Sequence, residues 1–148
     1  MDYTENDLKI FMDNIYSSYF DNNNGGMAAP DLFSFWFILN KYQPKIVIES
    51  GVWNGISTLL IRKTLPDCKI ICLDPRNISP TGYKDKSINT SYFLGKNFID
   101  FEKIDVSNYN SDDILCFFDC HQNTYLRLLQ CIKKKINKIF LNDNYPVN

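Results

Sequence analysis

Hydrophobic residues follow two different spacings along the chain, and the spacing changes near position 45. Before that point, apolar residues recur every three or four positions, which is the spacing of one face of a helix. After it, short apolar runs rich in β-branched residues alternate with stretches of helical spacing. The pattern predicts one domain, 1–148, with an N-terminal helical segment, 1–44, and an α/β core, 45–148.

Two helices are expected in the N-terminal segment. The first follows Thr4 to Asp7, a sequence typical of a capping box. Its apolar positions are Leu8, Phe11, Met12, Ile15 and Tyr19. The Asn- and Gly-rich segment 21–26 ends this helix. The second helix, from Asp31 to about Tyr42, is apolar on nearly every side, so we expect it to be buried.

The core alternates between strands and helices. The expected strands are 45–49, 69–73, 97–100 or its near neighbours, 113–118 and 138–141. One helix covers 56–63, and another follows the fourth strand. This second helix has Tyr125, Leu128, Leu129, Ile132 and Ile136 on one face. Segment 77–95 is expected to be a loop with a short helix. The fold class predicted is α/β, a Rossmann-like parallel sheet of about five strands flanked by helices, with the two N-terminal helices added.

The polar residues of the core gather where the strands end. Right-handed crossovers place every loop that follows a strand at the same edge of a parallel sheet, and ligands bind beyond that edge. The segments concerned are 49–55, Asp74, 100–105, 119–121 and 143–144. We therefore expect a binding site along this edge.

The loop 49–55, Glu-Ser-Gly-Val-Trp-Asn-Gly, joins the first strand to a helix. Its two glycines allow a sharp turn and a close approach of the backbone to a ligand, and the helix amides that follow offer hydrogen-bond donors. Asp74 ends the next strand, a position suited to holding ribose hydroxyls. The same residues also fit a plain structural turn at Gly51 and a helix cap at Asp74 or Ser57.

Residues 47–58, Val-Ile-Glu-Ser-Gly-Val-Trp-Asn-Gly-Ile-Ser-Thr, resemble the first motif of class I S-adenosylmethionine-dependent methyltransferases, E-x-G-x-x-x-G followed by Ser-Thr. The resemblance extends over about 45–145. It implies that Gly51 and Gly55 flank the methionine part of S-adenosylmethionine and that Glu49 supports the loop. Ser57 belongs to the same motif and is counted with the cofactor-binding residues.

The resemblance also implies the remaining cofactor contacts. Asp74 would hold the ribose, and the adenine contact would come from the loop after the third strand, with Asp100 or Asp105 as the candidate. These positions complete the predicted S-adenosylmethionine site.

A second group of polar residues follows the fourth and fifth strands. Asp119 and His121 follow the fourth strand, and Asp143 and Asn144 follow the fifth. Together, Asp119, Asp143 and Asn144 resemble the Mg²⁺ site of catechol-type and macrocin-type O-methyltransferases. Oxygen ligands suit Mg²⁺, which lowers the pKa of a bound hydroxyl. His121, the only histidine, is a candidate general base, and Asp119 is a second candidate catalytic residue. The competing interpretation makes Asp119 a helix cap and 143–144 a turn.

The predicted function is S-adenosylmethionine-dependent methyl transfer to a hydroxyl of a small molecule or sugar, with Mg²⁺ assisting. The alternative is a non-catalytic Rossmann-like module that binds a nucleoside or serves as a partner subunit. A third hypothesis is a different enzyme with the same fold, such as a hydroxylase. The family's fold normally adds two strands after the fifth. We therefore expect either a minimal or degraded member of the family or completion by a partner chain.

Composition narrows the partners and the compartment. The net charge of -1 excludes a strongly basic nucleic-acid-binding module. The N-terminus has no signal-peptide pattern, and no apolar run is long enough to span a membrane. The five cysteines form no C-x-x-C motif and fall mostly in apolar runs, which indicates reduced thiols and a cytoplasmic protein. The fifth strand, 138–141, is an apolar edge, so we expect a homodimer formed through it.

Overall fold

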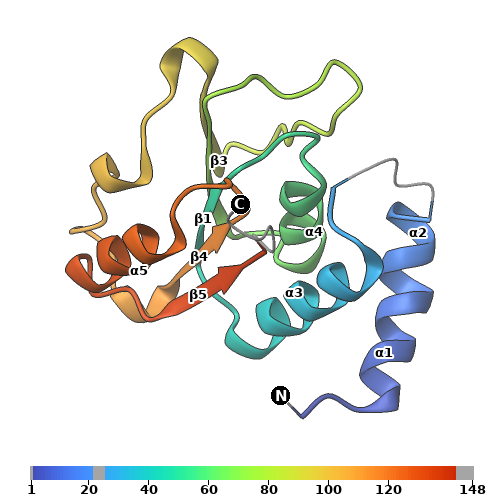
Figure 1. The fold of residues 1–148 in the computed structure, drawn as a ribbon. Coiled ribbons are helices and arrows are strands. Elements are labelled where there is room, and N and C mark those ends of the chain that lie inside the picture. Colours follow the sequence, from blue (N-terminus) through green and yellow to red (C-terminus); the bar gives the residue numbers. More distant parts are fainter. Residues whose placement is uncertain (1, 22–25, 143–148) are drawn as a thin grey trace.

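The structure is a computed structural model, and it describes residues 2–21 and 26–142. Its centre is a parallel sheet with the strand order β3-β2-β1-β4-β5 (Figure 1). The strands are β1, Ile46–Ser50; β2, Lys69–Asp74; β3, Thr90–Leu94; β4, Ile114–Phe118; and β5, Lys138–Leu141. All five residues of β1 and all five of β4 are buried, as expected for continuous apolar runs at the middle of a sheet covered on both faces. The α/β class and the parallel, Rossmann-like sheet are confirmed.

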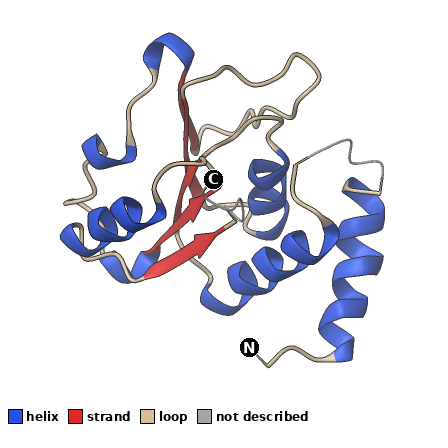
Figure 2. Cartoon of the chain, in the orientation of Figure 1, coloured by secondary structure: helices blue, strands red, loops and turns tan. Residues whose placement is uncertain are grey.

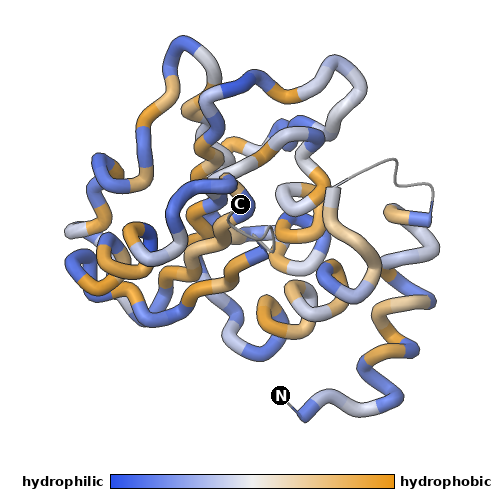
Figure 3. Tube along the Cα trace, viewed as in Figure 1, coloured by the Kyte–Doolittle hydropathy of each residue, from blue (hydrophilic) through white to orange (hydrophobic). Residues whose placement is uncertain are grey.

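Helices cover both faces of the sheet (Figure 2). One face packs against α3, Ala29–Tyr42, and α4, Ile56–Thr64, and the other packs against α5, Thr124–Lys133. Successive residues of β1 point to opposite faces. Val47 therefore belongs to the apolar cluster under α3 and α4, whereas Ile48 belongs to the cluster under α5. In Figure 3 the strands at the centre of the molecule are mostly hydrophobic.

The expected N-terminal helices are both present. The first is continuous and consists of α1, Glu5–Phe11, a π-helical turn, Met12–Tyr16, and α2, Ser17–Tyr19. Thr4 and Asp7 form the predicted capping box. The second helix, α3, buries five apolar side chains, Leu32, Phe33, Phe35, Trp36 and Leu39. No helix in the described residues is long and apolar enough to cross a membrane.

The predicted position of the third strand is wrong. The strand lies at 90–94, inside the segment expected to be loop and short helix, and residues 95–97 and 101–103 are short 3₁₀ turns. β3 is an edge strand in which every residue is half-buried. A strand of this kind needs no continuous apolar run, so Thr-Ser-Tyr-Phe-Leu gives a weak hydrophobic signal despite its strand-forming residues.

The predicted apolar face of α5 is not buried as a unit. Tyr125 is 67% exposed and Ile132 is 69% exposed, whereas Arg127 and Cys131 are the buried residues of the helix. Arg127 is buried because both oxygens of Asp100 pair with its guanidinium, at 2.8 and 2.9 Å. Arg127 thus occupies part of the buried side of α5, and part of the apolar surface of the helix is exposed to solvent.

Candidate functional site

The loop between β1 and α4, residues 51–55, begins and ends with a glycine in a left-handed conformation. Gly51 has φ 96° and Gly55 has φ 74°. A Cβ atom on Gly51 would lie 2.2 Å from the carbonyl oxygen of Asp119, and one on Gly55 would lie 2.1 Å from that of Tyr83. Both positions therefore require glycine for two reasons: the backbone has a positive φ, and another loop of the chain packs against the position that a Cβ atom would occupy.

Glu49, near the end of β1, is completely buried below this loop. Its carboxylate accepts hydrogen bonds from the Ser57 hydroxyl and, at 2.6 Å, from the Thr58 hydroxyl. The Cys72 thiol donates a third, at 3.2 Å. Burial raises the pKa of Glu49 to about 7, although these hydrogen bonds oppose the rise. Glu49 thus attaches the first turn of α4 to the sheet, and the Ser57 hydroxyl is engaged in that attachment.

Asp74, the last residue of β2, holds the other side of the loop. Its carboxylate accepts hydrogen bonds from the backbone amides of Val52 at 2.9 Å, Trp53 at 3.1 Å and Arg76 at 2.8 Å. Burial alone would raise the pKa of Asp74, but these amides and the Arg76 guanidinium lower it below its ordinary value. The side chain is 2% exposed, so its visible role is to fix the loop.

The first turn of α4 has no side-chain cap. Gly55 occupies the N-cap position and has no side chain that could accept a hydrogen bond from the helix amides. An uncapped helix N-terminus offers donors and positive potential to an anionic group. This end of α4 lies at the edge of the sheet where ligands of such folds bind.

The two candidates for the adenine contact lie in different places. Asp100 pairs with Arg127, in the first half of α5, close to the edge of the sheet that carries the glycine loop. Asp105 is exposed and accepts a hydrogen bond from the backbone amide of Ser107. The neighbouring carbonyl of Ile104 contacts Lys134, beyond the last residue of α5. Since α5 ends near the start of β5, the structure does not bring Asp105 together with the other cofactor candidates.

A pocket of about 440 Å³ lies beside the glycine loop. Its lining comes from the start of α3, the glycine loop and the ends of β4 and β5: Gly26, Met27, Ala28, Asp31, Trp53, Asp119, His121 and Asn142. Trp53, φ 42°, and His121, φ 52°, both have left-handed backbone conformations, which cluster at functional sites. The structure therefore brings the two predicted catalytic residues, Asp119 and His121, into one pocket.

Sequence reasoning missed Asp31, Trp53 and Asn142 as pocket residues. Trp53 was within the glycine motif, and its position between two glycines was an available signal. Asp31 carried no signal, because only the packing of α3 beside the sheet edge brings it to the pocket. Asn123 accepts the hydrogen bond that caps α5, so the alternative that Asp119 is this cap does not hold.

Only part of the predicted metal site falls within the described residues. Asp119 lines the pocket, whereas Asp143 and Asn144 lie outside the described residues. Among residues 2–21 and 26–142, no group of three or more His, Cys, Asp or Glu side chains is arranged to hold a metal ion.

The arrangement of the strands matches known structures. Three forms of CmcI superpose on the chain: one with Mg and SAM (TM-score 0.59, 21% identity), one with SAH (0.60, 20%) and an apo form (0.55, 19%). The chain therefore shares the Rossmann-like fold of these structures. The matches cover 78%, 80% and 77% of this chain but only 53%, 62% and 52% of the respective CmcI chains. The chain thus spans about half to three fifths of the length of those structures.

Comparisons by sequence add nothing to this result. No family model matches the chain, and no curated protein matches it.

Proposed function

We propose that the chain binds S-adenosylmethionine and transfers its methyl group to a hydroxyl of a small molecule or sugar. One observation carries this proposal: the glycine loop, held in place by Glu49 and Asp74, adjoins a pocket lined by Asp119 and His121. The similarity to CmcI forms with SAM and SAH supports the choice of cofactor.

The cofactor-binding residues in this proposal are those of the glycine loop and its supports. The backbone of Gly51 and Gly55 and the uncapped turn of α4 receive the methionine part, whose carboxylate suits the helix amides. The glycine loop 51–55 and the first turn of α4 together form the proposed cofactor cradle. Glu49, Ser57 and Asp74 fix the conformation of this cradle through their hydrogen bonds. Asp74 also remains the proposed ribose contact, and Asp100 is preferred to Asp105 for the adenine side.

The residues of the pocket orient the acceptor and receive its proton. When bound, S-adenosylmethionine supplies an electrophilic methyl carbon on a sulfonium. The acceptor oxygen forms a bond to that carbon while the carbon–sulfur bond breaks and its electron pair returns to sulfur. The hydroxyl proton passes to the His121 imidazole or the Asp119 carboxylate, either of which is a suitable general base. Holding the oxygen in line with the methyl group supplies much of the rate enhancement.

Two further features belong to the proposal. Mg²⁺ would be held by Asp119 with Asp143 and Asn144, and it would lower the pKa of the acceptor hydroxyl. The cytoplasm is the proposed compartment, because all five cysteines are free thiols and such thiols persist in reducing surroundings.

Calorimetric titration with S-adenosylmethionine and S-adenosylhomocysteine tests the proposal, with NAD as the control ligand. We expect both methionine nucleosides to bind and NAD to give no heat. Asp74→Ala should weaken binding by about 1–3 kcal/mol, the usual cost of losing a charged hydrogen-bond partner. Binding of NAD alone would refute the cofactor assignment. Binding of S-adenosylhomocysteine without methyl transfer to any hydroxylated acceptor would favour the non-catalytic nucleoside-binding module.

The metal part has a separate test. Mg²⁺ that binds the native state raises the melting temperature as its concentration increases. We expect such a rise for the parent and a smaller one for Asp119→Asn. A melting temperature that stays constant up to millimolar Mg²⁺ would remove the metal from the proposal.

A further inference from the structure

The segment 79–83, between β2 and β3, packs against the outer side of the glycine loop. The backbone amide of Tyr83 donates to the carbonyl of Asn54 at 2.8 Å, and that of Ser79 donates to the carbonyl of Trp53 at 3.4 Å. The carbonyl of Tyr83 fills the space that a Cβ on Gly55 would need. The glycine loop is thus held from two sides, since Asp74 accepts from its amides and segment 79–83 donates to its carbonyls.

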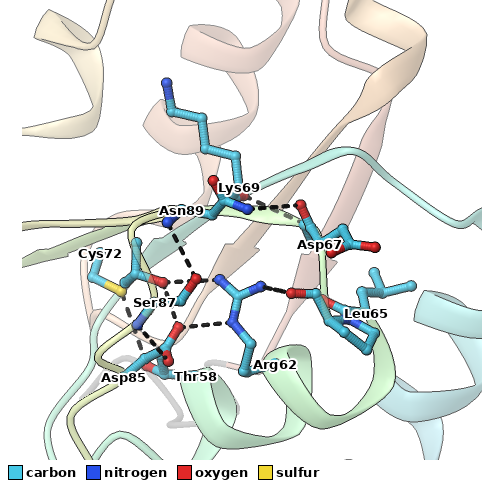
Figure 4. A network of polar contacts seen from close by, with 12 residues as sticks. Thr58, Arg62, Leu65, Asp67, Lys69, Cys72, Asp85, Ser87 and Asn89 are labelled. Atoms are coloured by element: carbon cyan, nitrogen blue, oxygen red, sulfur yellow. Dashed lines mark hydrogen bonds and ion pairs between the residues drawn. The ribbon is translucent and has the colours of Figure 1, made fainter.

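Asp85 holds segment 79–83 in this position. The residue is 8% exposed, and its carboxylate accepts a hydrogen bond from Arg62 Nε at 2.8 Å (Figure 4). It accepts another from the Thr90 hydroxyl. It also accepts from the Tyr83 hydroxyl at 3.3 Å and the Ser87 amide at 3.2 Å. Burial alone would raise the pKa of Asp85, but the hydrogen bonds of Thr90 and Arg62 lower it, so the group is ionised at neutral pH.

Arg62 connects this carboxylate to the helix that starts at the glycine loop. It lies on α4, and besides Asp85 it donates to the Thr90 hydroxyl at 3.0 Å and to the carbonyls of Leu65 and Pro66. Its side chain is 11% exposed. One buried ion pair therefore joins α4, the start of β3 and the segment that covers the glycine loop.

We infer that Asp85 is a positioning residue for the cofactor cradle, because it sets the backbone conformation of residues 53–55 through segment 79–83. Trp53 has a left-handed conformation, which persists only where surrounding contacts enforce it. Segment 79–83 supplies those contacts on the carbonyl side of the loop. This inference rests on the proposed function, since the cradle is the proposed binding site for S-adenosylmethionine.

The competing explanation is that the ion pair only adds to global stability. The two explanations differ in the folded protein well below its melting temperature. If the ion pair only adds stability, its loss leaves the conformation of the glycine loop and the affinity for S-adenosylhomocysteine unchanged below the melting temperature. A positioning effect loosens the glycine loop and weakens binding even when unfolding is negligible.

The experiment compares Asp85→Asn and Thr90→Val with Asp113→Asn. Thr90→Val keeps the β-branched shape and removes only the hydroxyl of the network, so it carries the test if Asp85→Asn does not fold. Asp113→Asn is the matched control, because Asp113 pairs at 3.0 Å with Lys45, which is 76% exposed and belongs neither to the Asp85 network nor to the glycine loop. Each protein is measured by hydrogen exchange of the amides of Val52 and Trp53, by titration with S-adenosylhomocysteine and by thermal melting.

For Asp85→Asn we expect exchange at these amides to be about tenfold faster and the Kd for S-adenosylhomocysteine to be about tenfold higher. Thr90→Val should change both in the same direction by a smaller factor, and Asp113→Asn should change neither. A lower melting temperature with unchanged exchange and affinity would overturn the inference, as would faster exchange with unchanged affinity. If the parent does not bind S-adenosylhomocysteine, the proposed function fails, and the exchange rates still decide whether Asp85 positions the loop.

Discussion

Glu49 gives the protein a pH dependence that we expect Glu49→Gln to remove. A carboxyl whose pKa is higher in the folded than in the unfolded state makes the fold most stable at low pH, and this stabilisation is lost as the pH rises from the lower to the higher pKa. That contribution is complete below the ordinary pKa of 4.5 and is lost as the pH rises through about 7. The parent should therefore become less stable between about pH 5 and pH 8.

The magnitude follows from the two pKa values. The difference between 4.5 and about 7 corresponds to about 3 kcal/mol in total, of which about 2 to 3 kcal/mol falls between pH 5 and pH 8. Gln carries no titrating proton. In the parent the Ser57 and Thr58 hydroxyls donate to different oxygens of Glu49, so the amide oxygen of Gln can accept from one hydroxyl while its amide nitrogen donates to the other. The stability of Glu49→Gln relative to the parent should increase by this amount across the same range.

Urea denaturation at intervals of one pH unit measures the effect. The range starts at about pH 5 because Asp74, Asp85 and Asp100, whose pKa values are lowered in the fold, lose their stabilising contribution only at more acidic pH. Glu102→Gln, at an exposed position, should keep the slope of the parent. Parallel curves for the parent and Glu49→Gln would refute the reasoning, because burial of a titrating carboxyl would then have no energetic consequence.

Two further predictions concern packing and association. Gly51→Ala should lower the free energy of unfolding, measured with urea, by at least about 2 kcal/mol, because the new Cβ meets the main chain of Asp119. The control Gly95→Ala meets only the movable Asn77 side chain and should lower it less. Equal losses for the two variants would contradict this explanation. The β5 edge and the exposed apolar side of α5 should drive self-association, which light scattering measures. Ile132→Glu should reduce the association, whereas the control Ile88→Glu, at a 99% exposed loop position, should not. A parent protein that stays monomeric at high concentration would refute the predicted dimer.

The sequence was sufficient to locate the strands that are buried on both faces of the sheet. The strands β1, β2 and β4 lie within a residue of their predicted positions, because their apolar runs are continuous. β5, an edge strand, was found at 138–141 from its apolar Ile-Phe-Leu run, whereas the other edge strand, β3, was misplaced because it begins with the polar residues Thr90 and Ser91. The exposed face of α5 was missed because the burial of Arg127 depends on a partner 27 positions away. Long-range pairing of this kind leaves no mark on local periodicity.

The candidate site divides in the same way. The glycine loop, Glu49 and Asp74 could be found from their positions at strand ends. The supporting role of Asp85 could not, because its partners lie on α4 and at the start of β3. Asp31 enters the pocket only through the packing of α3, which no local pattern encodes.

The close packing around the two glycines changes what the E-x-G-x-x-x-G pattern can report. The space next to Gly51 is filled by the main chain after β4, and the space next to Gly55 by Tyr83. Selection for folding alone would therefore retain both glycines in a descendant that had lost its chemistry. In a survey of relatives, the presence of this pattern would therefore indicate the fold and would not indicate activity. Under the proposed function, substitutions at the pocket residues Asp119 and His121 would be the ones that separate active members from inactive ones.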